Sequence, residues 1–304
     1  MKSTLIVIGG PTASGKSALA MNFSRHLDTE IISADSRQCF KEMTIGTAKP
    51  QKEDLDEITH HFVNSHSIHE HFSAGIFAEE AKKILVDLFK KKEYVVVVGG
   101  TGLYIRALTD GLDELPTVEI STREKVKSIF REKGIEALLE IIREKDPDYL
   151  SKVDQQNPSR LMRAAEIILQ TNEKYSVLLG KAKEKFPYHV IKLMINPERT
   201  VLYKNIDQRV DQMMEMGLLD EVTSLVPHKA LTTLHTVGYS ELFDYLEGKT
   251  TLDYAEDKIK QHSRNYAKRQ ITWFKNQGEF IFLNPAVDSL SPAEILQSQL
   301  LSKS

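Results

Sequence analysis

The chain has 304 residues, of which 41% are hydrophobic and 27% are charged. These fractions are typical of ordinary globular proteins and exclude collagen-like, disordered and coiled-coil classes. The formal net charge of −3 excludes a strongly basic coat for nucleic acid but is compatible with a local basic face. A chain of this length corresponds to about two domains.

Features of export and of membrane insertion are missing from the sequence. No apolar run approaches the length of a membrane span, and residues 1–10 lack the cleavage pattern of a signal peptide. The single cysteine, Cys39, cannot form an internal disulfide and excludes a zinc site built from several cysteines. We therefore expect a cytoplasmic protein that does not contact a membrane.

Short apolar runs predict buried parallel strands, because they are rich in valine or isoleucine and too short for helices. They occupy residues 4–8, 30–33, 94–98, 189–195 and 280–283. Helical patterns separate them at residues 17–26, 78–90 and 200–216. This alternation predicts an α/β fold with a parallel sheet flanked by helices.

One stretch interrupts the alternation. Residues 123–133, 135–145 and 159–170 have the periodicity of amphipathic helices, and no good strand lies between residues 118 and 185. Pro116 precedes this stretch and Pro187 follows it. We expect a discontinuous core at 1–117 and 186–304, with an all-helical insertion at 118–185.

A phosphate loop follows the first predicted strand. The pattern G-x-x-x-x-G-K-S is matched by Gly10, Pro11, Thr12, Ala13, Ser14, Gly15, Lys16 and Ser17. In such a loop, backbone N–H groups and the N-terminus of the next helix bind phosphate oxygens. Lys16 supplies a charge for the terminal phosphate, and Ser17 a hydroxyl for Mg²⁺. A chance glycine-rich turn is the alternative, which the flanking strand and helix disfavour.

The ends of two further strands narrow the class of enzyme. The strand at 94–98 ends in Gly99, Gly100 and Thr101, where an ATPase would place an aspartate that holds Mg²⁺. A guanine-reading Asn-Lys-x-Asp motif is also missing from the sequence. This favours a kinase-like or other group-transfer enzyme over a motor ATPase or a GTPase.

Asp35 follows the strand at 30–33 and should lie at the same edge of the sheet as the phosphate loop. A carboxylate there could accept a proton from a nucleophile or hold a metal-bound water. Capping of the following turn is an equally good interpretation. Thr101 should face the same crevice, although two preceding glycines favour simple turn chemistry for it.

Several motifs together resemble those of tRNA dimethylallyltransferases. They are GGPTASGKS at 9–17, ISADS at 32–36, IGTAKP at 45–50, VGGTGLY at 98–104, NPSR at 157–160, RAAE at 163–166, VGY at 237–239 and YAKRQITWF at 266–274. They cover nearly the whole chain in the order of the family. The resemblance implies a P-loop NTPase-like fold and a bacterial-type enzyme, because the C-terminal zinc finger of eukaryotic relatives is missing from the sequence.

The resemblance also implies a reaction. Dimethylallyl diphosphate would donate its five-carbon group to N6 of adenosine 37 in tRNAs that read codons beginning with U, and diphosphate would leave. The phosphate loop would then bind the diphosphate of the prenyl donor rather than ATP. The implied partners are the tRNA anticodon stem-loop and dimethylallyl diphosphate, the implied cofactor is Mg²⁺, and we expect a monomer without an obligate protein partner.

Roles for single residues follow from the same resemblance. Asp35 matches the general base that takes a proton from N6, and Thr101 matches a threonine that orients the amine and the diphosphate. Lys16 and Arg209 would neutralise the charge on the departing diphosphate, with Mg²⁺ at Ser17. The expected tRNA contacts are Asp35, Ser36, Arg37, Gln38, Thr101, Arg123, Ser159, Arg160, Leu161, Met162, Arg163, His235, Thr236, Val237, Gly238, Tyr239 and Ser240. The chain departs from the usual family pattern at Arg37, Cys39, Asn172, His235 and Ser240.

Three further groups of charged or titratable residues bear on the function. Residues 258–275 contain lysines and arginines but no acidic residue. Such a run is typical of a solvated face. Its overlap with the motif at 266–274 favours an RNA or phosphate contact instead. The histidines at 60, 61, 66, 69 and 71 lack the spacing of a zinc motif. Arg160 and Arg163 lie one turn apart on a helix and suit phosphate contacts, with a solvated face as the alternative.

Two other functions compete with prenyl transfer. A small-molecule P-loop kinase would use ATP and would deprotonate a hydroxyl with Asp35. A non-catalytic RNA-binding protein would use the phosphate loop as a switch.

Overall fold

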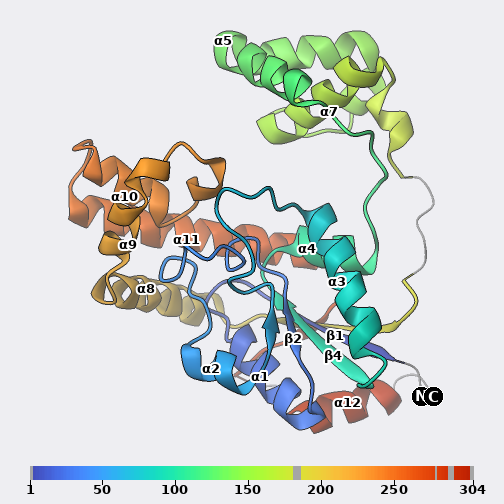
Figure 1. Ribbon diagram of the computed structural model, residues 1–304, viewed down its shortest axis with the longest axis vertical. Helices are drawn as coiled ribbons and strands as arrows, with labels where there is room; N and C mark the ends of the chain where they lie inside the picture. The colour runs from blue at the N-terminus through green and yellow to red at the C-terminus, as the bar shows by residue number, and fades with distance from the viewer. Residues whose placement is uncertain (1–2, 181–185, 278, 287–290, 302–304) are drawn as a thin grey trace. The chain divides into compact units, whose positions relative to one another are not determined.

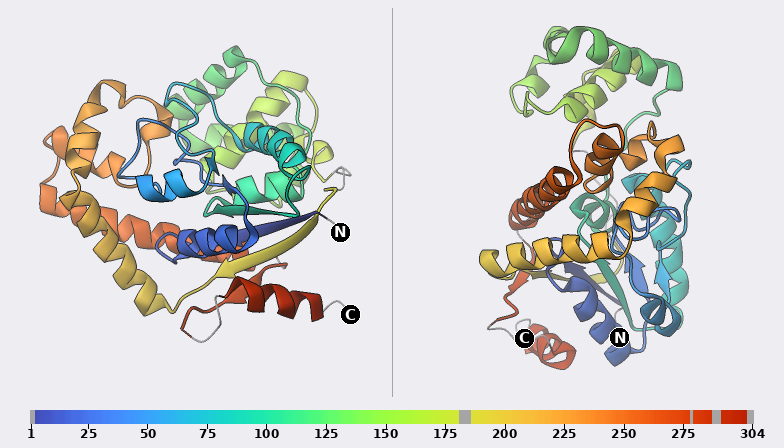
Figure 2. Two further views of the ribbon diagram at one scale, coloured as in Figure 1. Left: turned by 60° about the horizontal axis from the view of Figure 1, so that its bottom comes forward. Right: turned by 90° about the vertical axis from the view of Figure 1, so that its left-hand side faces the viewer.

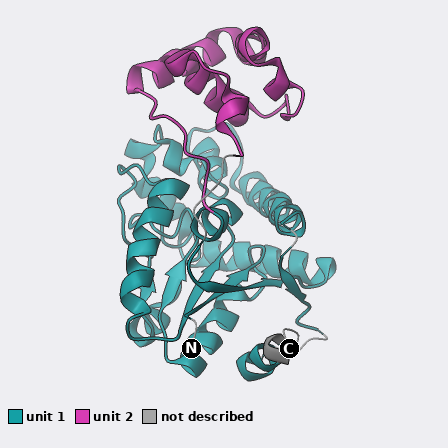
Figure 3. Ribbon diagram, turned by 90° about the vertical axis from the view of Figure 1, so that its right-hand side faces the viewer, with its two compact units in different colours: residues 1–110, 186–304 teal, residues 111–185 magenta. Residues whose placement is uncertain are grey.

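The computed structural model describes residues 3–180, 186–277, 279–286 and 291–301 of the chain. They divide into two compact units, which Figure 3 colours separately. Unit 1 comprises Met1–Asp110 and Phe186–Ser304, and unit 2 comprises Gly111–Lys185. The insertion was expected from residue 118, whereas unit 2 begins directly after helix α4 (Gly102–Thr109) and its cap Asp110.

A parallel sheet forms the centre of unit 1 (Figure 1). Within the described residues it has six strands, in the order β3-β2-β4-β1-β5-β6. They are β1 (Thr4–Gly9), β2 (Ile31–Ser33), β3 (His60–His61), β4 (Tyr94–Gly99), β5 (His189–Ile195) and β6 (Ile281–Leu283). In the register of the central strands, Thr4 of β1 pairs with Tyr94 and with His189. The chain changes direction across the sheet at β1, so the carboxyl end of β1 is a switch point where open α/β sheets bind ligands.

Both faces of this sheet are covered. The side chains of β1 alternate between the two faces, and every residue of β1 is buried. Helices α1 (Lys16–Leu27) and α12 (Pro292–Leu301) lie on the same side (Figure 2), where Phe23 and Ile295 share a hydrophobic cluster with Ile6. Helix α3 (Ala74–Leu88) packs on α4 through the stacked rings of Phe77 and Tyr104, whose centroids are 4.8 Å apart.

The remaining elements of unit 1 lie at the carboxyl edge of the sheet or beside it. They are α2 (Lys52–Glu57), α8 (Arg199–Glu215), α9 (Leu218–Ser224), α10 (Tyr239–Leu246), α11 (Leu252–Lys275) and the short helices η2 (Val226–His228) and η3 (Thr232–Leu234). Helix α11 lies against the ends of β1 and β4. A Cβ atom added to Gly9 of β1 would come within 2.5 Å of the Phe274 ring, and the Gln270 side chain donates to the Gly100 carbonyl oxygen directly after β4. The missing side chain therefore allows the helix to approach the sheet.

The regular secondary structure in the described part of unit 2 is entirely helical. It contains α5 (Ile120–Lys145), α6 (Pro147–Leu150), α7 (Pro158–Thr171) and the short helix η1 (Tyr175–Leu178). Gly134, with φ of 71° and ψ of −164°, interrupts α5 between the two helices that the sequence predicted there. Helix α7 begins at Pro158 because the Asn157 side chain accepts a hydrogen bond from the Arg160 N–H at 3.2 Å. Leu138, Ile142 and Leu161 belong to the core of this unit.

The predicted α/β fold with a parallel sheet is confirmed. The two-residue strand β3 was not predicted, since so short a run carries no pattern. Helix α3 begins at Ala74 rather than at residue 78, because Ser73 Oγ caps it by accepting the Ile76 N–H at 3.3 Å. In the part of the chain that the structure describes, no helix has both the length and the hydrophobicity needed to cross a membrane.

Candidate active site

The phosphate loop connects β1 to α1 at the switch point of the sheet. Ala13 and Gly15 adopt positive φ angles of 59° and 90°, so the backbone curls just before α1 begins at Lys16. No side chain caps the start of α1, and the buried Ser14 hydroxyl has no hydrogen-bond partner among the described residues. These uncapped N–H groups and this hydroxyl fit a phosphate-bearing ligand, whose oxygens would satisfy them.

Two cations flank the phosphate loop. Lys16 Nζ donates to the Pro11 carbonyl oxygen at 3.2 Å, and Arg209 Nη1 of α8 donates to Thr12 Oγ1 at 3.2 Å. Burial and the Arg209 charge lower the pKa of Lys16 to about 8, against the opposing effect of Asp35. Burial also lowers the pKa of Arg209. Neither cation has a salt-bridge partner within the described residues, so a polyanionic group would be strongly attracted here.

Asp35 follows β2 and caps the turn after it, which was one of its two interpretations. Its Oδ1 accepts hydrogen bonds from the backbone N–H groups of Arg37 and Gln38, at 2.9 Å and 3.3 Å. The second oxygen, Oδ2, accepts none from the described residues, and the side chain lines a pocket. One oxygen therefore caps the turn, while the other is available for a substrate.

Thr101 lies between β4 and α4 and contacts the turn that carries Asp35. Its Oγ1 accepts the Ser36 N–H at 3.1 Å and lies 3.3 Å from the Ser36 hydroxyl oxygen. The absence of a side chain at Gly99 allows the ends of β2 and β4 to approach closely. A Cβ atom there would come within 2.1 Å of the Ala34 carbonyl oxygen. Thr101 thus holds the turn of Asp35 and Ser36 in place, and it does not itself line the pocket.

One face of α11 closes the site. Ile259, Ser263, Tyr266 and Gln270 recur every three or four residues and line the pocket. The buried Gln270 amide accepts the Thr12 N–H at 2.9 Å and donates to the Gly100 carbonyl oxygen at 2.9 Å, which ties the phosphate loop to the end of β4. Burial and the Asp35 charge raise the pKa of Tyr266 to about 12, so its hydroxyl stays protonated.

The basic run on α11 is only partly free for a ligand. Lys260 pairs with Asp211 at 2.5 Å and Arg264 pairs with Asp207, and both acidic residues belong to α8. These pairs join the two helices. The exposed Lys268 and Lys275 remain on α11 without such a pair among the described residues.

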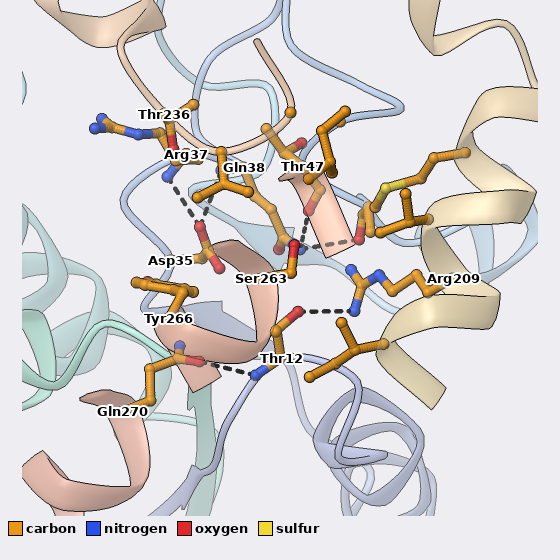
Figure 4. Close-up of a pocket in the computed structure, with 18 of the residues that line it drawn as sticks. Thr12, Asp35, Arg37, Gln38, Thr47, Arg209, Thr236, Ser263, Tyr266 and Gln270 are labelled. Carbon is orange, nitrogen blue, oxygen red and sulfur yellow. Dashed lines mark hydrogen bonds between the residues drawn. The ribbon is translucent and has the colours of Figure 1, made fainter. Parts of the chain in front are cut away.

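The pocket between these elements has a volume of about 250 Å³ (Figure 4). Its polar lining includes Thr12 and Ser17 of the phosphate loop, the cations Lys16 and Arg209, and Asp35. Its apolar lining comes from α8, α11 and the segment before α10, as Ile206, Val210, Met213, Val237 and Ile259. The pocket therefore offers charges and hydroxyls to a phosphate-bearing group and apolar contacts to a hydrocarbon.

The residues of unit 1 that were expected to contact tRNA have different environments. Those that line the pocket are Asp35, Ser36, Arg37, Gln38, Thr236, Val237 and Gly238, whereas Thr101 does not. His235 is exposed, with its Nε2 3.1 Å from the Lys229 carbonyl oxygen, and Ser240 is half-buried. Tyr239 is fully buried and donates its hydroxyl to Glu221 Oε1 at 2.6 Å. A contact of the Tyr239 side chain with tRNA is therefore corrected to a packing role.

Unit 2 holds the other residues expected to contact tRNA. Ser159 and Arg160 are exposed at the start of α7, whereas Met162 and Arg163 are half-buried. Arg163 pairs with Glu166 at 3.3 Å. Leu161 is fully buried in the core of the unit, so its expected tRNA contact is also corrected. Arg123 is half-buried near the start of α5.

Several pocket residues were not predicted from the sequence. They are Gly46, Thr47, Ala48, Ile206, Val210, Met213, Ile259, Ser263, Tyr266 and Gln270. Two signals could have identified part of this set. The motif at 45–50 carried the resemblance but received no site role, and an uncharged stripe at positions 259, 263, 266 and 270 runs through the basic segment at helical spacing.

The expected ion, Mg²⁺, is bound mainly by oxygen atoms. The described residues contain no group of three or more histidine, cysteine, aspartate or glutamate side chains that could hold an ion. Ser17 lines the pocket beside Lys16 and Asp35, and Mg²⁺ is often bound by few protein ligands together with substrate phosphates. Two of the histidines serve other contacts, since His61 pairs with Glu30 at 2.7 Å and His60 Nδ1 lies 2.7 Å from the Ile58 carbonyl oxygen.

Comparison with known proteins identifies the family of the chain. The sequence model of the IPP transferase family matches residues 38–277. The chain is 42% identical over 282 residues to tRNA dimethylallyltransferase 1 of Bacteroides thetaiotaomicron, which covers 93% of this chain and 92% of the relative. It is 42% identical over 300 residues to tRNA dimethylallyltransferase of Christiangramia forsetii, which covers 99% of each chain.

A solved structure is similar over its whole length. The full-length tRNA isopentenylpyrophosphate transferase from Bacillus halodurans has a TM-score of 0.72 to this chain at 32% identity, and the match covers 99% of this chain and 97% of that one. Sequence and structure therefore agree on one assignment. The chain belongs to the IPP transferase family.

Proposed function

We propose that the protein transfers a dimethylallyl group from dimethylallyl diphosphate to N6 of adenosine 37 in tRNAs that read codons beginning with U. Membership of the IPP transferase family and the names of the relatives support prenyl transfer to tRNA. The observation that carries the proposal is the mixed lining of the pocket. Lys16 and Arg209 suit a diphosphate, whereas Val210, Met213 and Ile259 suit a hydrocarbon group. A prenyl diphosphate has both parts.

The reaction joins N6 of the adenine to C1 of the donor while the bond between C1 and the diphosphate oxygen breaks. The N6 amine is a poor nucleophile because its lone pair is delocalised into the ring. Asp35 Oδ2 accepts the N6 proton as the new bond forms, and the hydrogen bond to it concentrates the lone pair on nitrogen. The N–H groups of Arg37 and Gln38 hold Oδ1 and so fix the orientation of the carboxylate.

The leaving diphosphate carries the charge that develops in this step. Lys16, Arg209 and the N–H groups at the start of α1 neutralise it in the pocket. Ser17 would hold Mg²⁺ together with oxygens of the donor. When bound, the ion would supply further positive charge to the leaving group.

The acceptor base lies within the anticodon stem-loop, so it must leave the stack before its N6 can reach the pocket. Arg37 and the segment of Thr236, Val237 and Gly238 line the pocket and are the candidates for contact with the extruded nucleotide. The exposed Arg160 of unit 2 suits the phosphate backbone of the tRNA.

A single assay separates this function from its alternatives. Unmodified tRNA is incubated with the protein, Mg²⁺ and either dimethylallyl diphosphate or ATP, and the tRNA is digested and weighed by mass spectrometry. We expect one dimethylallyl group on adenosine 37, and none on a matched tRNA with guanosine at that position. ATP consumption with unmodified tRNA would instead identify a small-molecule kinase, and tight tRNA binding without either reaction would identify a non-catalytic switch.

A further inference from the structure

Glu221 of α9 collects four hydrogen-bond donors on one carboxylate. Its Oε2 accepts the backbone N–H groups of Thr44 at 2.9 Å and Ile45 at 2.7 Å. Its Oε1 accepts the Gly46 N–H at 3.1 Å and the Tyr239 hydroxyl at 2.6 Å. Three successive N–H groups that converge on one anion form a backbone nest, which holds the loop in a single conformation.

This carboxylate joins two walls of the pocket. One wall contains Gly46, Thr47 and Ala48, and the other contains the three residues that precede Tyr239. The walls also touch directly, because a Cβ atom on Gly46 would come within 2.6 Å of the Tyr239 ring. Burial and the charge of Glu221 raise the pKa of Tyr239, so its hydroxyl remains a donor to the carboxylate.

The same loop leads to the catalytic base. The Gln38 side-chain amide donates to the carbonyl oxygens of Thr47 at 3.3 Å and Ala48 at 3.0 Å, and the Gln38 backbone N–H donates to Asp35 Oδ1. Figure 4 shows Gln38 between Thr47 and Asp35. A continuous series of hydrogen bonds therefore runs from Glu221 through the loop to Asp35, although Glu221 does not line the pocket.

We propose that Glu221 is a positioning residue for the transfer reaction, which fixes the loop of residues 44–48 and, through Gln38, the orientation of Asp35. This inference rests on the proposed prenyl transfer. Donor binding depends on Lys16, Arg209 and the phosphate loop, which Glu221 does not contact. Loss of Glu221 should therefore slow the chemical step much more than it weakens donor binding.

The test compares Glu221→Gln with Asp220→Asn. Asp220 is an exposed acidic residue next to Glu221 on α9, so its replacement removes the same charge without touching the loop. A glutamine keeps one oxygen as an acceptor for two of the four donors. It turns an NH₂ group, which cannot accept, toward the other two donors. We expect Glu221→Gln to lower the single-turnover rate of prenyl transfer by about 10- to 100-fold, as small misplacements of reacting groups do.

Two further measurements separate positioning from a general structural role. The dissociation constant for dimethylallyl diphosphate, measured without tRNA, should stay within about threefold of the wild type. Amide hydrogen exchange of the loop of residues 44–46 should become faster in Glu221→Gln and stay unchanged in Asp220→Asn. If Glu221→Gln does not fold, Tyr239→Phe removes one of the four bonds and retains the ring, and it should slow transfer in the same direction with donor affinity retained.

The outcomes distinguish this inference from the proposed function. A Glu221→Gln rate equal to that of Asp220→Asn, with an active wild type, would overturn the positioning role. Equal losses of rate and donor affinity would also overturn it, since they indicate general damage. A wild type that transfers no prenyl group would refute the proposed function instead, and the exchange measurement alone would then decide whether Glu221 holds the loop.

Discussion

Asp35 and Lys16 bring opposite charges into one pocket, and their contacts give them different tasks. Asp35 uses one oxygen for the turn and leaves the other for a substrate. Within the described residues Lys16 donates only to a carbonyl oxygen of its own loop, and burial together with the Arg209 charge lowers its pKa. A proton acceptor and a titratable anion-binding group therefore occupy the same pocket.

Replacement of Asp35 by asparagine tests the proton acceptor. The asparagine oxygen can still accept the N–H groups of Arg37 and Gln38, so we expect little change in melting temperature. It cannot take a proton from N6, and the single-turnover rate should fall by about 10²–10⁴-fold. Donor affinity, measured on the same sample, should change little. A stable Asp35→Asn variant with full activity would contradict the assignment of Asp35 as the base.

The lowered pKa of Lys16 predicts a pH dependence of donor binding. Lys16 in the free protein is charged below pH 8 and neutral above it, and the diphosphate binds the charged form. Affinity for dimethylallyl diphosphate in the absence of tRNA should therefore be constant below about pH 7 and should fall as the pH rises through 8, approaching about tenfold per pH unit. Calorimetric titrations of the donor between pH 6.5 and pH 9.5 measure this affinity. The range extends about one and a half pH units to either side of the Lys16 pKa.

The control for this titration is Lys16→Ala. This variant should bind the donor weakly, and its affinity should no longer change near pH 8, because Arg209 stays charged throughout the range. An identical pH dependence in the variant would assign the titration to another group.

At the scale of single elements, α11 depends on the absence of side chains beneath it. A Cβ atom on Gly102 would come within 2.2 Å of the Trp273 ring, near the middle of the indole. Gly102→Ala should therefore destabilise the protein by about 1–3 kcal/mol, as overpacked cores usually do, although alanine is the better helix former. Chemical denaturation measures the change, and transfer activity should fall with it because α11 carries Tyr266 and Gln270.

Gly75→Ala is the matched control for this prediction. Gly75 lies in the first turn of α3, and an added Cβ atom there would meet only the Ser73 hydroxyl oxygen at 3.8 Å. This substitution should be neutral or slightly stabilising. If Gly102→Ala were as stable as Gly75→Ala, α11 would not need its close approach to the start of α4.

The elements also explain which parts of the site the sequence could predict. The phosphate loop and Asp35 were accessible because consecutive residues and the ends of strands carry their signal. Gln270 was not, since its partners Gly100 and Thr12 lie 170 and 258 residues away and meet it only when α11 packs on the sheet. Glu221 was missed for the same reason, being 177 residues from Thr44.

Motif segments indicate a region of the chain but not the environment of each side chain. The resemblance placed Leu161 and Tyr239 among the tRNA contacts, together with their neighbours. Both side chains are fully buried, because the period of a helix turns some residues of any continuous segment into the core. Apart from β3, the strands were predictable within one residue at each end, since buried parallel strands are nearly continuous apolar runs.

At the scale of the whole molecule, the two arginines of α7 predict how tRNA binding responds to salt. If both contact phosphates, Arg160→Ala combined with Arg163→Ala should weaken tRNA binding and lower the slope of log affinity against log salt by up to about two units. Filter binding across a range of salt concentrations gives this slope. Arg143→Ala, an exposed arginine of α5 outside the expected set, serves as control. An unchanged slope in the double variant would leave both arginines as solvated residues.

The order of the strands has a consequence for synthesis of the protein. β1 is the first strand to leave the ribosome, yet it pairs with β4 and with β5, whose first residue is His189. Unit 2 is one continuous segment and lies entirely before β5, so all of its internal contacts are available before the sheet is complete. Its folding would shorten the loop that must close when β5 reaches β1. The nascent chain should therefore assemble its insertion before β5 joins the sheet, and the phosphate loop should become competent to bind a ligand only after β5 has been made.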